Sequence, residues 1–114
     1  MNAPQLQQLS GDVCVAPQLD ADAMAWAAEA GFKSVVNNRP DHEDGPDQPT
    51  NAVIEAAAAA AGLRYAWLPV SPAVQTAKDI AGFAALLAEL PKPILAFCRT
   101  GTRSGKLYRA ATGR

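Results

Sequence analysis

A seven-residue run, Cys98-Arg99-Thr100-Gly101-Thr102-Arg103-Ser104, holds the residue types of an anion-activated nucleophile. An apolar, strand-like stretch at residues 93–97 precedes it, and residues 104–111 are expected to form a helix. Backbone N–H groups of a loop that enters a helix converge on one point, where the helix dipole adds positive charge. The two arginines add full charges, so we expect Cys98 to lose its proton readily and act as a nucleophile. Gly101 permits a positive φ and a close approach to a ligand.

The alternative for Cys98 is a structural cysteine at the end of a core strand, since free cysteine is often buried. A core cysteine does not require two arginines and a glycine on a helix-opening loop, so the nucleophile is favoured. Cys14 has the opposite context, because it lies in an apolar, strand-like stretch without basic neighbours. We expect Cys14 to be structural.

Composition bounds the remaining possibilities. With 114 residues, 49% of them hydrophobic and 18% charged, the chain is expected to form a single globular domain, residues 1–114. The net charge of −1 gives no reason to expect a nucleic-acid or acidic-membrane partner. Two cysteines in different contexts do not make a disulfide framework, which fits a reducing compartment. Met1–Gln8 resembles no export signal and no apolar run could span a bilayer, so a cytoplasmic protein is expected.

Strand and helix patterns alternate along the chain. Capping residues and glycines mark where the helices begin and end. Asp20 precedes the first helix, Gly31 and Gly62 follow the first and second helices, and a Thr76–Asp79 capping box precedes the third helix. The alternation predicts an α/β fold with a mostly parallel sheet flanked by helices, whose ligands bind at the carboxyl ends of the strands, as Cys98 would. Strands are expected at residues 12–16, 32–37, 64–70 and 93–97, and helices at 21–30, 51–61, 77–90 and 104–111.

Several segments together resemble a known family. Residues 32–43, residues 61–65 followed by Leu68-Pro69-Val70, and residues 97–104 look like the beta-lactamase-hydrolase-like protein, phosphatase-like domain family. This is a small bacterial branch of the protein-tyrosine/dual-specificity phosphatase fold, with some members named sulfurtransferases and some fused to metallo-hydrolases of persulfide metabolism. The resemblance covers nearly the whole chain and implies a dual-specificity-phosphatase-like fold.

The resemblance also implies roles for residues of the loop. Cys98 would be the nucleophile, Arg103 the oxyanion-binding arginine, and Ser104 the hydroxyl that stabilises the leaving thiolate. Independently of the resemblance, the intervening residues of the anion-binding loop are expected to bind the substrate: Arg99, Thr100, Gly101 and Thr102.

Two departures from the wider phosphatase pattern bear on the reaction. Phosphatases of this fold place five residues between the cysteine and the arginine, whereas four stand between Cys98 and Arg103, and rhodanese-type sulfurtransferases also carry a short loop. Related phosphatases also place an acidic residue in the loop after the third strand. Here residues 71–73 are Ser-Pro-Ala, and no carboxylate occurs between Ser71 and Asp79. Loss of a general acid costs roughly 10²–10⁴-fold in rate, while sulfur transfer releases a stable anion and needs no acid. The usual histidine before the cysteine is replaced by Phe97.

The polar loop at residues 38–49 contains His42, the only histidine, among several carboxylates. One histidine is weak support for a metal site, so a solvated acidic loop without metal is expected. By the resemblance, Arg39 lies beside the Cys98 loop, where it could pair with Glu43 and brace the rim or could touch substrate. Trp26 and Trp67 are expected in the core.

Three functions remain open. The sequence favours an enzyme that transfers sulfur through a Cys98 persulfide. The alternative is a phosphatase that forms a phosphocysteine, and the second alternative is a non-catalytic module that binds oxyanions or phosphoproteins. The expected partner is a small sulfur or phosphate oxyanion, and no cofactor is expected. Phosphatases of this fold usually continue beyond the position of Arg114, so a homodimer or a partner domain is also expected there.

Overall fold

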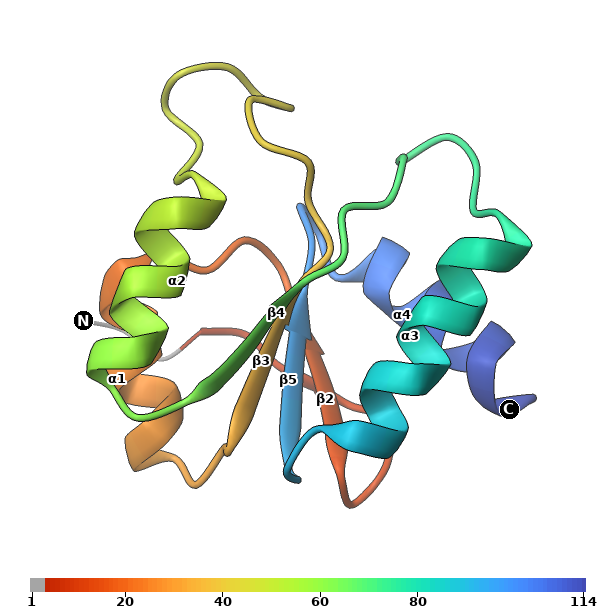
Figure 1. Ribbon diagram of the computed structural model, residues 1–114, viewed down its shortest axis with the longest axis horizontal. Helices are drawn as coiled ribbons and strands as arrows, with labels where there is room; N and C mark the ends of the chain where they lie inside the picture. Colours follow the sequence, from red (N-terminus) through yellow and green to blue (C-terminus); the bar gives the residue numbers. More distant parts are fainter. Residues whose placement is uncertain (1–3) are drawn as a thin grey trace.

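Strands and helices alternate along residues 4–114, the part of the chain that the computed structural model describes (Figure 1). The predicted α/β fold is confirmed, with each predicted element present. The strands are β1 (Gln7–Gln8), β2 (Val13–Ala16), β3 (Ser34–Asn37), β4 (Arg64–Trp67) and β5 (Ile94–Phe97), and the helices are α1 (Ala21–Glu29), α2 (Asn51–Ala60), α3 (Ala77–Glu89) and α4 (Thr102–Thr112).

The strands form one sheet in the order β1-β2-β5-β3-β4. The four strands β2, β5, β3 and β4 are parallel, and Ala96 of β5 pairs with Val15 on one side and Val36 on the other. The short β1 adds an antiparallel edge to β2. It was not expected from the sequence, because its two residues are exposed glutamines without a strand pattern. No export signal is expected from the sequence in residues 1–8. Residues 1–3 of that segment lie outside the part of the chain that the structure describes.

The core has two layers because helices cover both faces of the sheet. Figure 1 shows α1 and α2 on one face of the sheet and α3 and α4 on the other. Along β5, Leu95 and Phe97 pack in the core cluster with α1 and α2, while Ile94 and Ala96 pack in the cluster with α3 and α4. A parallel strand that is buried on both faces must be apolar at every position, and all four residues of β5 are fully buried. This rigid central strand carries Cys98 at its carboxyl end.

Side-chain caps fix where the helices begin. Asp20 caps α1 by accepting a 2.9 Å hydrogen bond from the Ala23 N–H. Thr76 and Asp79 form the predicted capping box of α3, with reciprocal hydrogen bonds of 2.9 and 3.1 Å. The Asp79 carboxylate is therefore engaged at the start of α3.

Three predicted boundaries were wrong by two residues or more. β3 begins at Ser34, two residues after its expected start. β4 ends at Trp67, three residues early, although the Leu68 N–H still donates to Asn37, the last residue of β3, and the Val70 N–H donates to Asn38. Pro69 is tolerated here because β4 is an edge strand and the missing N–H would face away from β3. α4 begins at Thr102, two residues early, because Gly101 turns the chain at φ +92° and accepts the first helical hydrogen bond.

The expected core position was also wrong for one tryptophan. Trp26 is partly buried against Phe32, at 6.3 Å between ring centroids, but Trp67 is 41% exposed. The Trp67 indole N–H donates to the Arg39 carbonyl at 2.8 Å, so this ring covers the backbone of the polar loop. Cys14, expected to be structural, is a half-buried β2 residue packed against the core, and burial raises the pKa of its thiol.

Within residues 4–114, no helix is both long and apolar enough to cross a membrane.

Candidate active site: a thiol in an anion-binding loop

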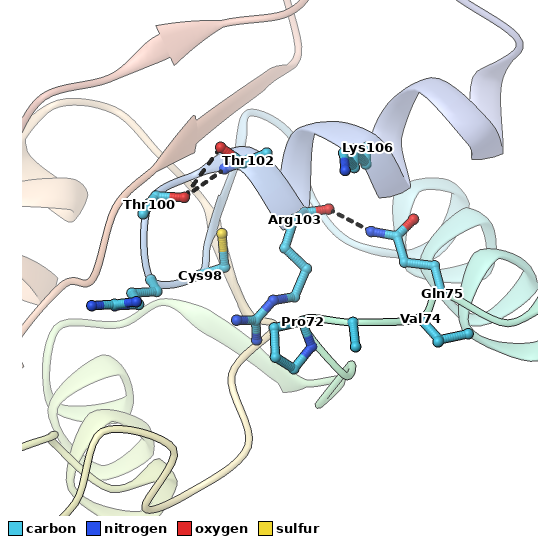
Figure 2. A pocket seen from close by; sticks show the side chains of 10 residues that line it. Pro72, Val74, Gln75, Cys98, Thr100, Thr102, Arg103 and Lys106 are labelled. Carbon is cyan, nitrogen blue, oxygen red and sulfur yellow. Dashed lines mark hydrogen bonds between the residues drawn. The ribbon is translucent and has the colours of Figure 1, made fainter.

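Cys98 lies at the end of β5 with its side chain enclosed by the loop that leads into α4 (Figure 2). The residue is 1% exposed, and its backbone N–H donates to the Ala16 carbonyl of β2 at 3.3 Å. Its Sγ accepts a hydrogen bond from the Gly101 N–H at 3.0 Å. The loop therefore points a backbone N–H at the sulfur of the candidate nucleophile.

The first turn of α4 has no side-chain cap at its N-cap position, although the Thr102 N–H donates to Thr100 Oγ1 at 3.4 Å. Gly101 occupies the N-cap position and has no side chain to accept from the first turn. A Cβ on Gly101 would stand 3.5 Å from the Ala16 backbone in a left-handed conformation, so glycine is required by φ rather than by space. The 11-residue helix therefore directs its positive end at the loop around Cys98.

Arg103 is buried beside the sulfur and held in a fixed orientation. Its Nη1 donates to the carbonyls of Asn38 (3.2 Å) and Val70 (3.1 Å), and its Nη2 donates to Glu43 Oε1 at 2.9 Å. The residue is 8% exposed, yet its Nε has no hydrogen-bond partner within residues 4–114. One donor of the guanidinium is thus unpartnered, on an atom that is itself buried, in a residue that lines the pocket.

Two carboxylates of the β3–α2 loop hold the arginines in place. Glu43 Oε1 lies 2.9 Å from both Arg39 Nε and Arg103 Nη2, so one oxygen bridges two guanidinium groups. Asp44 Oδ2 lies 2.8 Å from Arg39 Nη2 and 3.2 Å from Arg99 Nε. The predicted Arg39–Glu43 pair is therefore present.

The same contacts shift both carboxyl pKa values. Burial raises the pKa of Glu43, but hydrogen bonds from Arg103 and Arg39 and their positive charges outweigh it, and the pKa is lowered. The hydrogen bond from Arg39 is the largest cause of a lowered pKa at Asp44, burial opposes it, and the charge of Arg99 adds to it. Both groups are carboxylates at neutral pH.

The lowered pKa of Glu43 predicts a loss of stability in acid. A depressed folded-state pKa gives stability that is complete above the unfolded value of about 4.3 and is lost as pH falls through the folded value. Glu43→Gln should lower the free energy of unfolding at pH 7 by roughly 2 kcal/mol, because two arginines lose a charged acceptor. Urea denaturation between pH 3 and 7 should show this difference shrinking toward zero in acid. A difference that stays constant with pH would exclude Glu43 as the titrating group.

A cavity of about 410 Å³ opens above the sulfur. Loop residues 98–100, two first-turn residues of α4 and Lys106 form one side, and residues 72–75 after β4 form the other. Gln75 ties the two sides together, since its Nε2 donates to the Arg103 carbonyl at 3.0 Å (Figure 2). None of the residues that line this cavity is a carboxylate, and Asp79, the nearest downstream in sequence, is used in the α3 cap.

The predicted site residues separate into two groups. Cys98, Arg99, Thr100, Thr102 and Arg103 line the cavity together. The other three, Gly101, Ser104 and Arg39, do not line it.

Each residue of the second group has a different position. Gly101 directs its N–H at the sulfur from behind the loop. Ser104 is fully buried and its Oγ donates to Asn38 Oδ1 at 2.8 Å. Arg39 is 3% exposed and bound to Gln18, Glu43 and Asp44, contacts that favour bracing over substrate binding.

Sequence reasoning missed or misjudged other residues around the site. The acidic loop was expected to be solvated, but Glu43 is 15% exposed and neutralises two arginines. Asn38, which holds both Ser104 and Arg103, carried no sequence signal beyond its place after β3. Lys106 and Gln75 carried no sequence signal either, because only the folded chain places them at the cavity.

His42 adopts φ +61°, and no cluster of three metal-binding side chains occurs in the described chain.

Comparisons with known proteins agree with this geometry. The sequence profile of the family described as beta-lactamase hydrolase-like protein, phosphatase-like domain, matches residues 5–113. A beta-lactamase hydrolase-like protein from Agrobacterium fabrum is 46% identical over 88 residues, which cover 77% of this chain and 20% of that protein. The chain thus spans about a fifth of the length of this curated relative.

Solved structures with a similar fold are phosphatases by description. A candidate phosphatase from Neisseria meningitidis has a TM-score of 0.77 at 32% identity, covering 89% of this chain and 71% of that one. The core catalytic domain of a PP-IP phosphatase from S. cerevisiae, in complex with citrate, has a TM-score of 0.71 at 17% identity, covering 93% and 64%. At that identity the second likeness shows the fold alone.

The resemblance suggested by the sequence is therefore confirmed, and the fold is that of the protein-tyrosine/dual-specificity phosphatases. This chain belongs to the family of beta-lactamase hydrolase-like proteins, phosphatase-like domain.

Proposed function

We propose that this protein is a Cys-dependent hydrolase of phosphate monoesters that works through a phosphocysteine at Cys98. The observation that carries the proposal is the anion cradle itself. Cys98 lines the cavity at the N-terminus of α4, which no side chain of its N-cap residue caps, and the buried Arg103 lines the same cavity. The relatives and structural neighbours add support, because they are described as phosphatase-like.

The reaction would proceed in two balanced steps. The Cys98 thiolate attacks phosphorus, the S–P bond forms, and the P–O bond to the leaving group breaks with its electron pair on that oxygen. Water then attacks the phosphocysteine, the S–P bond breaks, and inorganic phosphate and the thiolate are released. Backbone N–H groups of the loop and the Arg103 guanidinium would bind the equatorial oxygens, where negative charge accumulates.

The lining of the cavity restricts which esters could react. A leaving alkoxide requires a proton from a general acid, while a phenoxide of low pKa leaves without one. Since no carboxylate lines the cavity, activated aryl phosphates should be hydrolysed much faster than alkyl phosphates. This order also applies to physiological substrates, which would carry a good leaving group.

Sulfur transfer, which the sequence favoured, remains the second candidate, because the same missing carboxylate and the short loop support it. The Cys98 thiolate would attack the outer sulfur of thiosulfate, forming a cysteine persulfide and releasing sulfite with the electrons of the broken S–S bond. Sulfite leaves as a stable anion and needs no proton. The similarity to phosphatases favours hydrolysis over this reaction.

The leaving-group dependence tests the proposal directly. Initial rates should be measured for aryl phosphates that span a range of phenol pKa values and for an alkyl phosphate, with thiosulfate-to-cyanide transfer measured on the same preparation. We expect kcat/KM to fall steeply as the phenol pKa rises, with the alkyl ester slower by at least about 10²-fold. Asp79→Asn is the control and should leave this slope unchanged. Efficient sulfur transfer without release of phosphate would contradict the proposal.

A further inference from the structure

Three cations line the cavity, and their charges are balanced unequally. Arg103 is paired with Glu43 at 2.9 Å, and Arg99 is paired with Asp44 at 3.2 Å. Lys106 has neither a carboxylate nor a hydrogen-bond partner within residues 4–114. Glu43 and Asp44 are both shared with Arg39, so they do not balance all three arginines, but each arginine has a carboxylate partner. Among the three cations that line the cavity, Lys106 is the one without a carboxylate partner in the described chain.

Lys106 lies on the same face of α4 as the first-turn residues of the loop. It follows Arg103 by three residues and Thr102 by four, which places it one helical turn away, about 5 Å along the helix axis. Figure 2 shows Lys106 further along α4 than Arg103, at the side of the cavity that Gln75 bridges. The cavity therefore has a second cationic position, one helical turn beyond Arg103.

The two positions differ in kind. The first, at Cys98, is a built anion site, where the free Nε belongs to a side chain that is more than nine-tenths buried. The second is a flexible ammonium group, which binds a point charge without fixed geometry. Between them, Pro72, Ala73 and the 62% exposed Val74 offer an apolar wall that can contact a carbon skeleton.

We propose that the cavity selects small substrates with two anionic groups, the reacting phosphoryl group over Cys98 and a second phosphate or carboxylate at Lys106. This proposal rests on the proposed function for the identity of the reacting group. The volume of about 410 Å³ is that of a small-molecule site. A short apolar linker between the two anions would lie along residues 72–74.

The test uses inert ligands, so that it does not depend on turnover. Alkylation of Cys98 by iodoacetamide should be followed in the presence of two series of ligands. One series consists of alkylphosphonates with chains of two to four carbons, and the other of ω-carboxyalkylphosphonates with the same chain lengths. At the best chain length we expect the carboxylated ligand to protect Cys98 at about fivefold lower concentration than its uncharged match. Lys106→Gln should abolish this advantage, and Lys106→Arg should retain it. Lys33→Gln, at the amino end of β3, is the control, because it removes the same charge away from the cavity. This variant should also retain the advantage of the carboxylated ligand.

The outcomes separate this proposal from the proposed function. An advantage that depends on Lys106, in a protein that hydrolyses no phosphate ester, supports the second anion position and overturns the hydrolase. Equal protection by both ligands, or an advantage that persists in Lys106→Gln, overturns the second anion position even where hydrolysis is found. Absence of protection by every phosphonate overturns it as well. An advantage that falls with added salt supports the electrostatic origin.

Discussion

Replacement of Cys98 with serine is expected to abolish turnover, with a loss of at least about 10⁴-fold in kcat. A serine hydroxyl needs a neighbouring base to become a nucleophile, and no such base is at hand. No carboxylate or histidine lines the cavity, and the only histidine, His42, lies outside it. The thiolate therefore cannot be replaced by oxygen at this position.

The serine variant should keep the fold. The single hydrogen bond that Sγ accepts, from the Gly101 N–H, can be accepted by Oγ as well. We expect thermal midpoints within a few degrees of each other and equal protection by phosphate from limited proteolysis. Activity at wild-type levels in the folded variant would exclude Cys98 as the nucleophile.

Arg103→Lys is expected to lower kcat/KM by about 10²–10³-fold. The ammonium group of lysine keeps the positive charge beside Glu43, but it cannot donate to Asn38 O, Val70 O, Glu43 and an oxyanion from a planar fork. Arg103→Ala would also leave Glu43 and two carbonyls without this donor, at a cost of roughly 3–5 kcal/mol in stability. The lysine variant therefore separates catalysis from folding.

Steady-state kinetics and phosphate protection of Cys98 from alkylation measure this effect. Arg109→Lys, an exposed arginine on the same helix, is the matched control and should behave as the wild type. Unchanged kinetics and protection in Arg103→Lys would mean that the guanidinium serves only to hold Glu43 and the loops together.

The fold could be predicted because its signals are local. Asp20, Thr76 and the glycines mark helix ends, and the apolar residues of β5 mark a strand that is buried on both faces. Cys98 at the carboxyl end of that strand follows from the general position of ligand sites in parallel sheets. β1 could not be predicted, since two exposed glutamines owe their strand conformation only to pairing with β2.

The surroundings of the loop could be predicted only in part. The Arg39–Glu43 pair was expected from the family resemblance, but the bridge from Glu43 to Arg103 joins residues 60 positions apart. A carboxylate in a polar loop looks solvated in sequence, and only the fold reveals that it lies against two buried guanidinium groups. Likewise, Ser104 was assigned to the leaving thiolate by resemblance, while its hydroxyl donates to Asn38.

The preference between the two chemistries also changed for a physical reason. The sequence favoured sulfur transfer on the strength of a short loop and a missing acid, and both features persist in the structure. They restrict the leaving group without excluding phosphoryl transfer, because an activated ester leaves without a proton. The phosphatase-like family and fold then give the alternative the stronger support.

The identity of the covalent adduct on Cys98 tests the central claim most directly. The wild-type protein should be mixed with an aryl phosphate of low leaving-group pKa, quenched in acid within the first turnover, and analysed by intact mass and peptide mapping. A parallel sample should receive thiosulfate. The account predicts a phosphoryl group on the peptide that contains Cys98, absent from Cys98→Ser. A gain of one sulfur atom on Cys98 after thiosulfate, with no phosphoryl adduct and no release of phosphate, would contradict it.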